Sequence, residues 1–227
     1  SKFDCKIIKS FSNSLTKDRQ IGIDACNSKY VAMIDADHYL ESNSITNLLE
    51  DLIKFNFDII QSKLEPYDQS TLLGKAEKQL YDITHNNSGP KKMIGTAPAI
   101  YNKKIFEEIK FDEKITAKMD DTDFIYRLSK LGKYKYGVGN TIIKQYHINS
   151  FFDYYRKYIW YGRGDGEFIR KYPYKIFSIL NNLIINYLIA YPLKSLVRFK
   201  FLAIPFSFFQ GITRLFGLIR YFILTQK

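Results

Sequence analysis

Two carboxylates separated by one residue follow an apolar stretch near the start of the chain. Residues 30–34 read Tyr-Val-Ala-Met-Ile, and Asp35 and Asp37 come directly after them. The apolar run predicts a buried strand, whose C-terminal end would carry both acids, where open α/β sheets bind ligands. Two anionic oxygen donors suit a divalent metal that phosphates also hold. The alternative is that the pair caps a turn into the next helix.

Two further groups could share that site. Acidic residues open an expected helix at positions 120–123, and His147 follows an expected strand. A carboxylate at a helix start is stabilised by the helix dipole, which is a sufficient structural reason for the acids. The functional alternative is that one of them takes a proton from an acceptor hydroxyl. A lone histidine is commonly structural, and His147 is a candidate metal ligand only because the acidic residues accompany it.

The elements that must position these residues alternate between strands and helices. Strands are predicted at residues 5–9, 30–34, 57–61, 95–101 and 136–146. Helices are predicted at residues 16–26, 45–53, 70–84, 103–109 and 120–131, and again from residue 150, with an interruption at the glycine-rich residues 162–166. This order predicts an α/β fold with a mostly parallel sheet flanked by helices. In such a sheet the acids and His147 can face one crevice.

Composition narrows the class of partner. The 227 residues suffice for one sizeable domain, or one domain with an appendage. The net charge of +11 favours anionic partners such as phosphorylated substrates or an anionic membrane. No dense run of Lys and Arg appears, so nucleic acid is not expected as a partner. The two cysteines, Cys5 and Cys26, form neither a disulfide framework nor a zinc motif, which favours a reducing compartment.

The composition changes beyond Pro173. Residues 173–227 contain basic residues but no acidic ones, and residues 176–191 carry no charge. That uncharged run of about 16 residues is shorter than the ~20 that span a bilayer. Apolar stretches with Lys and Arg favour helices that lie on an anionic membrane face. The alternatives are a helical subdomain packed on the core and a hairpin that spans the membrane. We therefore predict two parts, residues 1–172 and residues 173–227.

Four motifs in order resemble inverting family-2 glycosyltransferases. The first is Arg-Gln-Ile-Gly at 19–22, followed by the strand and Asp-x-Asp at 29–37. The second is Gly-Thr-Ala-Pro-Ala-Ile-Tyr-Asn at 95–102 with Phe-Asp-Glu at 111–113, and the third is Asp-Asp-Thr-Asp-Phe at 120–124 with Arg-Leu at 127–128 and Leu-Gly at 131–132. The fourth is His147, followed by Tyr-Gly-Arg-Gly at 161–164. The resemblance covers residues 7–166. It implies a GT-A fold and transfer of a sugar, with inversion, from a nucleotide-diphosphate donor.

The resemblance also implies roles for individual residues. Asp121 would be the general base. Asp37 would bind Mg²⁺ or Mn²⁺, with Asp35 near the metal and the donor ribose, and His147 would be a further metal or diphosphate contact. Arg19 and Arg163 would lie near the donor phosphates, and Thr96 and Ala97 would line the pocket for the transferred sugar.

Two departures from the family pattern stand out. Asp120 replaces the usual Glu and keeps its charge, while the N-terminal strands that bind the nucleotide base are absent, because residues 6–8 resemble the family's third strand. We therefore expect the chain to be a fragment of a longer protein. The leading hypothesis is an enzyme at the cytoplasmic face of a membrane that builds a cell-surface polysaccharide or a lipid-linked sugar. The alternatives are a non-catalytic α/β module that docks a partner or an anionic membrane, and a metal-dependent phosphohydrolase.

Overall fold

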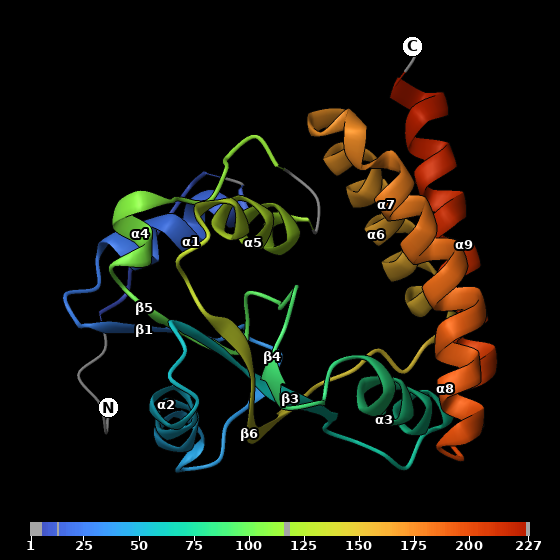
Figure 1. Ribbon diagram of the computed structural model, residues 1–227, viewed down its shortest axis with the longest axis horizontal. Coiled ribbons are helices and arrows are strands. Elements are labelled where there is room, and N and C mark those ends of the chain that lie inside the picture. Colours follow the sequence, from blue (N-terminus) through green and yellow to red (C-terminus); the bar gives the residue numbers. More distant parts are fainter. Residues whose placement is uncertain (1–5, 13, 116–118, 226–227) are drawn as a thin grey trace.

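The chain forms an α/β part and a layer of C-terminal helices that lie side by side (Figure 1). A computed structural model describes residues 6–12, 14–115 and 119–225. Within them the strands are β1 (Tyr30–Met33), β2 (His38–Tyr39), β3 (Ile59–Pro66), β4 (Gly89–Pro90), β5 (Ala99–Asn102) and β6 (Tyr136–Gln145). The helices of the α/β part are α1 (Leu15–Asp24), α2 (Ser44–Lys54), α3 (Leu72–Thr84), α4 (Ile105–Glu108) and α5 (Asp120–Leu131).

The predicted α/β class is confirmed, but the sheet is mixed rather than mostly parallel. Its order is β1-β5-β3-β6-β2, with β4 also paired to β6. β3 and β6 pair in parallel, whereas β5 runs antiparallel to both β1 and β3. The β-α-β order correctly implied that β1 and β3 run in the same direction. It could not show that β5, which follows much later in the chain, inserts between them.

Most local predictions are confirmed within a few residues. The side chain of Ser14 caps α1 by accepting from the Lys17 N–H, and Thr71 caps α3 in the same way through the Gly74 N–H. Gly132 ends α5 with φ 68°, a left-handed conformation that favours glycine. The strand predicted at residues 5–9 is wrong for residues 6–9, which have no regular structure, and Cys5 lies outside the described residues.

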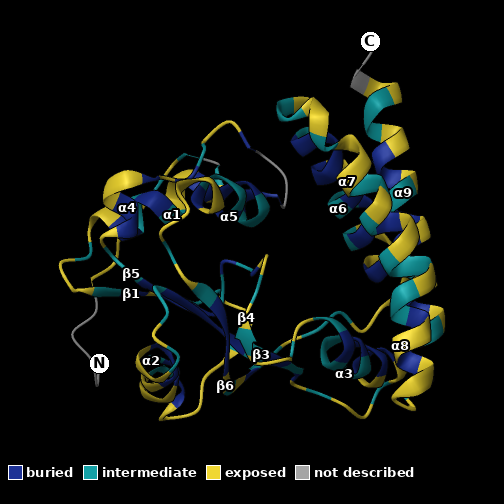
Figure 2. Ribbon diagram, viewed as in Figure 1, coloured by how far each residue is buried: buried dark blue, intermediate teal, exposed yellow. Residues whose placement is uncertain are grey.

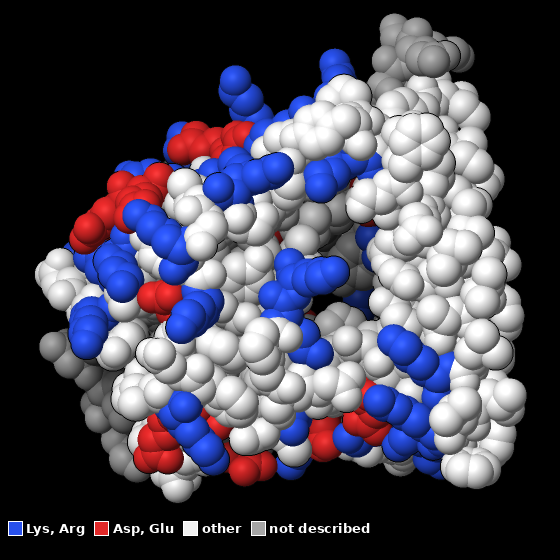
Figure 3. Space-filling view, viewed as in Figure 1, with Lys and Arg blue, Asp and Glu red and all other residues white. Residues whose placement is uncertain are grey.

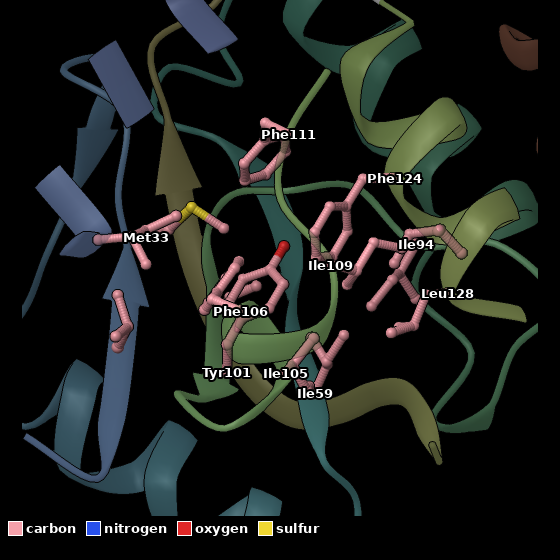
Figure 4. Close-up of a cluster of buried hydrophobic side chains, with 14 of the residues drawn as sticks. Met33, Ile59, Ile94, Tyr101, Ile105, Phe106, Ile109, Phe111, Phe124 and Leu128 are labelled. Atoms are coloured by element: carbon pink, nitrogen blue, oxygen red, sulfur yellow. The ribbon is translucent and has the colours of Figure 1, made fainter. Parts of the chain in front are cut away.

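Two clusters of buried apolar side chains cover the faces of the sheet. Figure 4 shows the cluster that contains Ile59, and buried stretches of the strands and helices are dark blue in Figure 2. Adjacent residues of a strand point to opposite faces, so Ile59 and Ile60 enter different clusters. Ile59 packs with Tyr101 and Phe124 beneath α1, α4 and α5, while Ile60 packs with Leu48 of α2. Burial of each such side chain contributes about 1.5–3 kcal/mol, which holds the end of β1 and the start of α5 in a fixed arrangement.

The second layer consists of α6 (Phe151–Lys171), a 3₁₀ turn at Pro173–Lys175, α7 (Ile176–Asn181), a π-helix η2 (Asn182–Ala190), α8 (Tyr191–Val197) and α9 (Ala203–Thr225). The predicted interruption at residues 162–166 is wrong, because α6 continues through all of them. The glycines serve helix packing instead. A Cβ at Gly162 would overlap the Arg214 carbonyl of α9, and one at Gly166 would overlap the Tyr221 ring.

The outer surface of this layer is apolar. The helical stretch Pro173–Val197 is long and apolar enough to cross a membrane, and only 11% of its most apolar window is buried. Phe177 and Val197 are each about four-fifths exposed. The helices α6 and α9 pack along each other (Figure 1). The division into residues 1–172 and 173–227 stays a prediction, and α6 lies in the same layer as the helices that follow it.

Candidate active site

A large cavity separates the α/β part from the C-terminal helices, and Figure 3 shows it as a hollow between them. Its volume is about 1710 Å³. All predicted site residues except His147 are among those that line it, namely Arg19, Asp35, Asp37, Thr96, Ala97, Asp121 and Arg163. Residues far apart in the sequence therefore line one cavity.

The Asp35–Asp37 pair lies directly after β1, as its sequence predicted. The side chains of Asp35 and Asp37 are 45% and 48% exposed, so their oxygens are accessible from the cavity. Gln145, at the end of β6, donates an amide hydrogen bond to Asp37 Oδ2 at 2.8 Å. Ligand atoms of Asp35, Asp37 and His38 lie within 4.8 Å of one another. The two carboxylates of this group are oxygen donors that a divalent cation can use.

His38 is a neighbour of the acids that the sequence reasoning missed. Its ring is almost fully buried, and its Nδ1 accepts a hydrogen bond from the Asp35 N–H at 3.0 Å. Burial lowers the pKa of His38, so the ring is neutral near pH 7. With Nδ1 occupied, the ring holds the turn that presents both carboxylates. The only sequence signal was its position directly after Asp37.

Arg19 joins the two acidic groups of the site. Its guanidinium donates to Asp120 through Nη1 and to the Asp35 oxygens through Nη2, at 3.2 and 3.4 Å. Only 13% of the Arg19 side chain is exposed. The resemblance implied a position near the donor phosphates. The structure places Arg19 on the cavity wall with its charge shared between two carboxylates, which fixes α5 relative to the end of β1.

Asp121 has the properties of a proton acceptor. Burial and the neighbouring Asp120 raise the pKa of Asp121 to about 6. The Thr122 N–H and hydroxyl donate to Asp121 Oδ1 at 2.6 and 3.3 Å, which partly opposes this shift. A carboxylate with this pKa is ionised at pH 7 and holds a proton more strongly than an exposed one. It can therefore take a proton from a hydroxyl group placed in the cavity.

The remaining predicted residues occupy different places. Thr96 and Ala97 line the cavity just before β5, and the Thr96 carbonyl accepts a hydrogen bond from the Tyr101 hydroxyl at 3.0 Å. Arg163 lines it from α6. His147 lies instead beside the start of α3, with Nε2 3.1 Å from the Thr71 hydroxyl. The His147 ring thus contacts α3, whereas the preceding residue, Tyr146, donates its N–H to the Asp37 carbonyl at 2.7 Å. The predicted role of His147 stays a prediction.

Lys157 is a second residue that the sequence reasoning missed. It lies on α6, lines the cavity and has its ammonium 3.7 Å from Glu77 Oε1. Although burial acts in the opposite direction, the pKa of Lys157 is raised by Tyr161, Glu77 and Asp37. A cation of the helical layer is therefore paired with Glu77 of α3 and also attracted by Asp37. No sequence pattern distinguishes Lys157 from the other basic residues of α6.

The chain matches a known protein family and is similar to solved structures. The sequence profile described as glycosyl transferase family 2 matches residues 1–128, more than half of the chain. No curated protein matches the chain. Among solved structures, S. aureus TarS is 12% identical with a TM-score of 0.45, and the match covers 93% of this chain and 43% of TarS. The TarS fragment 1–349 in complex with UDP-GlcNAc is 12% identical with a TM-score of 0.45, over 93% of this chain and 71% of that one. The chain thus spans less than half of the length of TarS.

Proposed function

The chain belongs to glycosyl transferase family 2, and we propose that it transfers a sugar from a nucleotide-diphosphate donor, with inversion, to a glycan or lipid-linked acceptor. The observation that carries this proposal is that Asp35, Asp37 and Asp121 line one cavity although they come from the end of β1 and the start of α5. Family membership makes the chain a glycosyltransferase. The donor class, the inversion, the metal and the acceptor are proposals.

In the proposed reaction Asp121 removes the proton from an acceptor hydroxyl. The oxygen of that hydroxyl forms a bond to the anomeric carbon as the bond from this carbon to the diphosphate oxygen breaks, so a single displacement inverts the configuration. The nucleoside diphosphate leaves with the electron pair of the broken bond. This scheme needs one base and no protein nucleophile, and Asp121, with a pKa of about 6, is suited to that task.

The Asp35 and Asp37 carboxylates fit a divalent cation. Both are close together and accessible from the cavity, and hard oxygen donors of this kind suit Mg²⁺ or Mn²⁺. When bound, such an ion would offset the charge on the departing diphosphate. Among the chain's own residues, we assign Arg163 to the donor phosphates and Thr96 and Ala97 to the transferred sugar. Arg19 orients Asp35 and Asp120, and His147 is retained as a more distant diphosphate contact.

The C-terminal helices are proposed to hold the enzyme at the cytoplasmic face of a membrane. Residues 173–227 contain no acidic residue, and their outer surface is largely apolar. Such a surface suits the interface of an anionic bilayer. An acceptor anchored in lipid, or a growing cell-surface polysaccharide, could then reach the cavity, because the same helices form one of its walls.

Donor binding and transfer test the proposal together. Calorimetry of the full-length protein with a panel of nucleotide-diphosphate sugars should show binding that depends on Mn²⁺. Asp121→Asn should abolish transfer and leave this binding largely intact. Asp153→Asn is the matched control, because Asp153 lines the same cavity from α6 and has no proposed role. Absence of donor binding in the wild type, or continued transfer by Asp121→Asn, would contradict the proposal.

A further inference from the structure

The cavity wall opposite the α/β part contains a π-helix. The segment η2 (Asn182–Ala190) follows the wider π-helical hydrogen-bond pattern over nine residues, and Asn182, Asn186 and Tyr187 of this segment line the cavity. π-Helical turns are rare and occur frequently at functional sites. Arg163 of the neighbouring α6 is assigned to the donor phosphates, but no residue of η2 has a role in the proposed reaction.

Packing places the helical segment just before the two asparagines against the residues that precede the proposed base. Ile179 of α7 packs against the cluster formed by Ile115, Met119 and Phe168, and Met119 directly precedes α5. Ile179, Asn182 and Asn186 all line the cavity, so the two asparagines lie on the side of this segment that faces it. They therefore extend along the cavity from the helix start that carries Asp121.

The helix has a polar side and an apolar side. Ile184, Ile185 and Ile189 of η2 are exposed and are not among the residues that line the cavity. Asn186 Nδ2 donates to Asn182 Oδ1 at 2.8 Å. That bond uses one donor and one acceptor, which leaves the Asn182 amide NH₂ and Asn186 Oδ1 for a ligand. Neutral amides in pairs can both donate to and accept from hydroxyl groups.

Tyr187 is held in place on the same wall. Arg214 forms two hydrogen bonds with the buried Asp165, at 2.9 and 2.7 Å, and its Nη1 donates to the Tyr187 hydroxyl at 3.1 Å. The guanidinium also lies over the Tyr187 ring, with 5.6 Å between its carbon and the ring centroid. This network joins α6, η2 and α9, so the wall is rigid where it carries the amides.

From this arrangement we propose that Asn182 and Asn186 form the subsite for the sugar acceptor and bind its hydroxyl groups. The inference rests on the proposed transferase function and adds the residues that hold the second substrate. Asp35 and Asp37 of the α/β part hold the donor end together with Arg163 of α6, and the amides of η2 hold the acceptor. Asp121 lies where the acceptor hydroxyl would meet the donor sugar.

Binding of simple glycosides tests the subsite directly. The full-length protein would be purified in a detergent without a sugar headgroup and titrated with methyl glycosides of glucose, galactose and N-acetylglucosamine, using ligand-observed NMR. Asn182→Ala and Asn186→Ala should each weaken the Kd of a bound glycoside about three- to tenfold, the effect of one lost neutral hydrogen bond. Neither should change the Kd of a nucleotide-diphosphate sugar measured with Mn²⁺.

Ile185→Ala is the matched control, because it truncates a side chain of the same π-helix on the side away from the cavity. It should retain glycoside binding. Thermal unfolding of each variant checks that it is folded. If the wild type binds donor but none of the glycosides, or if the asparagine variants lose donor affinity rather than glycoside affinity, the subsite is refuted while the transferase proposal stands. A wild type that binds no donor would refute the transferase proposal itself.

Discussion

Asp120 and Asp121 are adjacent at the start of α5, but their carboxylates have different partners. Asp120 accepts a hydrogen bond from the Arg19 guanidinium, whereas Asp121 accepts from the N–H and hydroxyl of Thr122. Burial raises the pKa of both, and Arg19 opposes the rise at Asp120 more strongly than at Asp121. One carboxylate is therefore held by Arg19, whereas its neighbour can exchange a proton with a substrate.

This difference predicts the pH dependence of transfer. The pKa of Asp121 in the folded protein is about 6, above the ordinary 3.8, so the carboxyl is protonated below pH 6 and cannot act as a base. At saturating donor and acceptor, the rate should rise about tenfold per pH unit below 6 and level off above it. Rates measured between pH 4.5 and 8 would show this limb. A rate that is flat across pH 6 would exclude Asp121 as the base.

The same shift predicts that Asp121→Asn stabilises the fold at neutral pH. The folded state binds the Asp121 proton more tightly than the unfolded state does, so its stabilising effect is complete below pH 3.8 and is lost as pH rises through 6. Replacing the carboxylate with a neutral amide removes that loss. Thermal unfolding at pH 7.5 should therefore show a higher midpoint for Asp121→Asn, with Asp153→Asn unchanged as the control. An equal or lower midpoint for Asp121→Asn would mean that its charge is not penalised by burial.

Arg19 should matter for stability as well as for catalysis. Arg19→Met would leave Asp120, whose side chain is 6% exposed, without its guanidinium partner. Removing one member of a buried ion pair costs about 3–5 kcal/mol, because the remaining charge is uncompensated. Urea unfolding at pH 7.5 should show a loss of this size. The double variant Arg19→Met with Asp120→Asn should recover part of it, and no recovery would mean that Arg19 acts through contacts other than this pair.

Metal binding can show which of the predicted ligands, Asp37 or His147, holds the ion. Asp37 is accessible from the cavity, whereas His147 contacts Thr71 at the start of α3. Asp37→Ala should abolish the binding of Mn²⁺ in the presence of donor, as measured by calorimetry, because it removes one of two anionic ligands. His147→Ala should weaken Mn²⁺ binding far less, because His147 is proposed as a more distant diphosphate contact. If His147→Ala instead loses the metal, the His147 ring leaves Thr71 in the donor-bound enzyme and is itself a metal ligand.

Much of the fold could be predicted from local pattern. The apolar run before Asp35 and the acids before Phe124 identify β1 and α5, and both elements lie where the sequence predicts them. Their convergence could be expected because strand ends and helix starts gather at one edge of an α/β sheet. The insertion of β5 between β1 and β3 could not, since it depends on pairing between segments far apart in the chain.

The errors at particular residues have physical causes. Glycine weakens an isolated helix, so Gly162 and Gly166 predicted a break. In the structure both lie within α6, at positions where α9 approaches too closely for any side chain. Only the tertiary structure shows that α9 is the partner. His38 and Lys157 were missed for a similar reason. A single histidine or lysine gives no pattern, and their meaning comes from the carboxylates that lie near them in space.

The glycine contacts give a further prediction. A Cβ at Gly162 would overlap the backbone of Arg214, which cannot move as a flexible side chain would. Gly162→Ala should therefore destabilise the protein by at least about 2 kcal/mol, within the range for overpacked sites. Gly22→Ala is the matched control, because Gly22 is also helical and nothing lies within 4 Å of its added Cβ. It should stabilise by about 0.5–1 kcal/mol. Urea unfolding that shows the same sign for both would refute the packing role of Gly162.

The membrane proposal is best tested with surface substitutions. Deleting residues 173–227 would also remove α9, which packs on α6 and α3, and so would uncover the core. Phe177 and Val197 are 80% and 78% exposed, so Phe177→Glu with Val197→Glu should leave the fold intact. Each apolar side chain contributes about 1.5–3 kcal/mol when buried, so the double variant should bind vesicles of phosphatidylglycerol and phosphatidylcholine at least about tenfold more weakly in a flotation assay. Ile53→Glu on α2, where Ile53 is 63% exposed, is the control and should bind like the wild type. Equal binding by the double variant and the control would show that this face of the helices does not contact the bilayer.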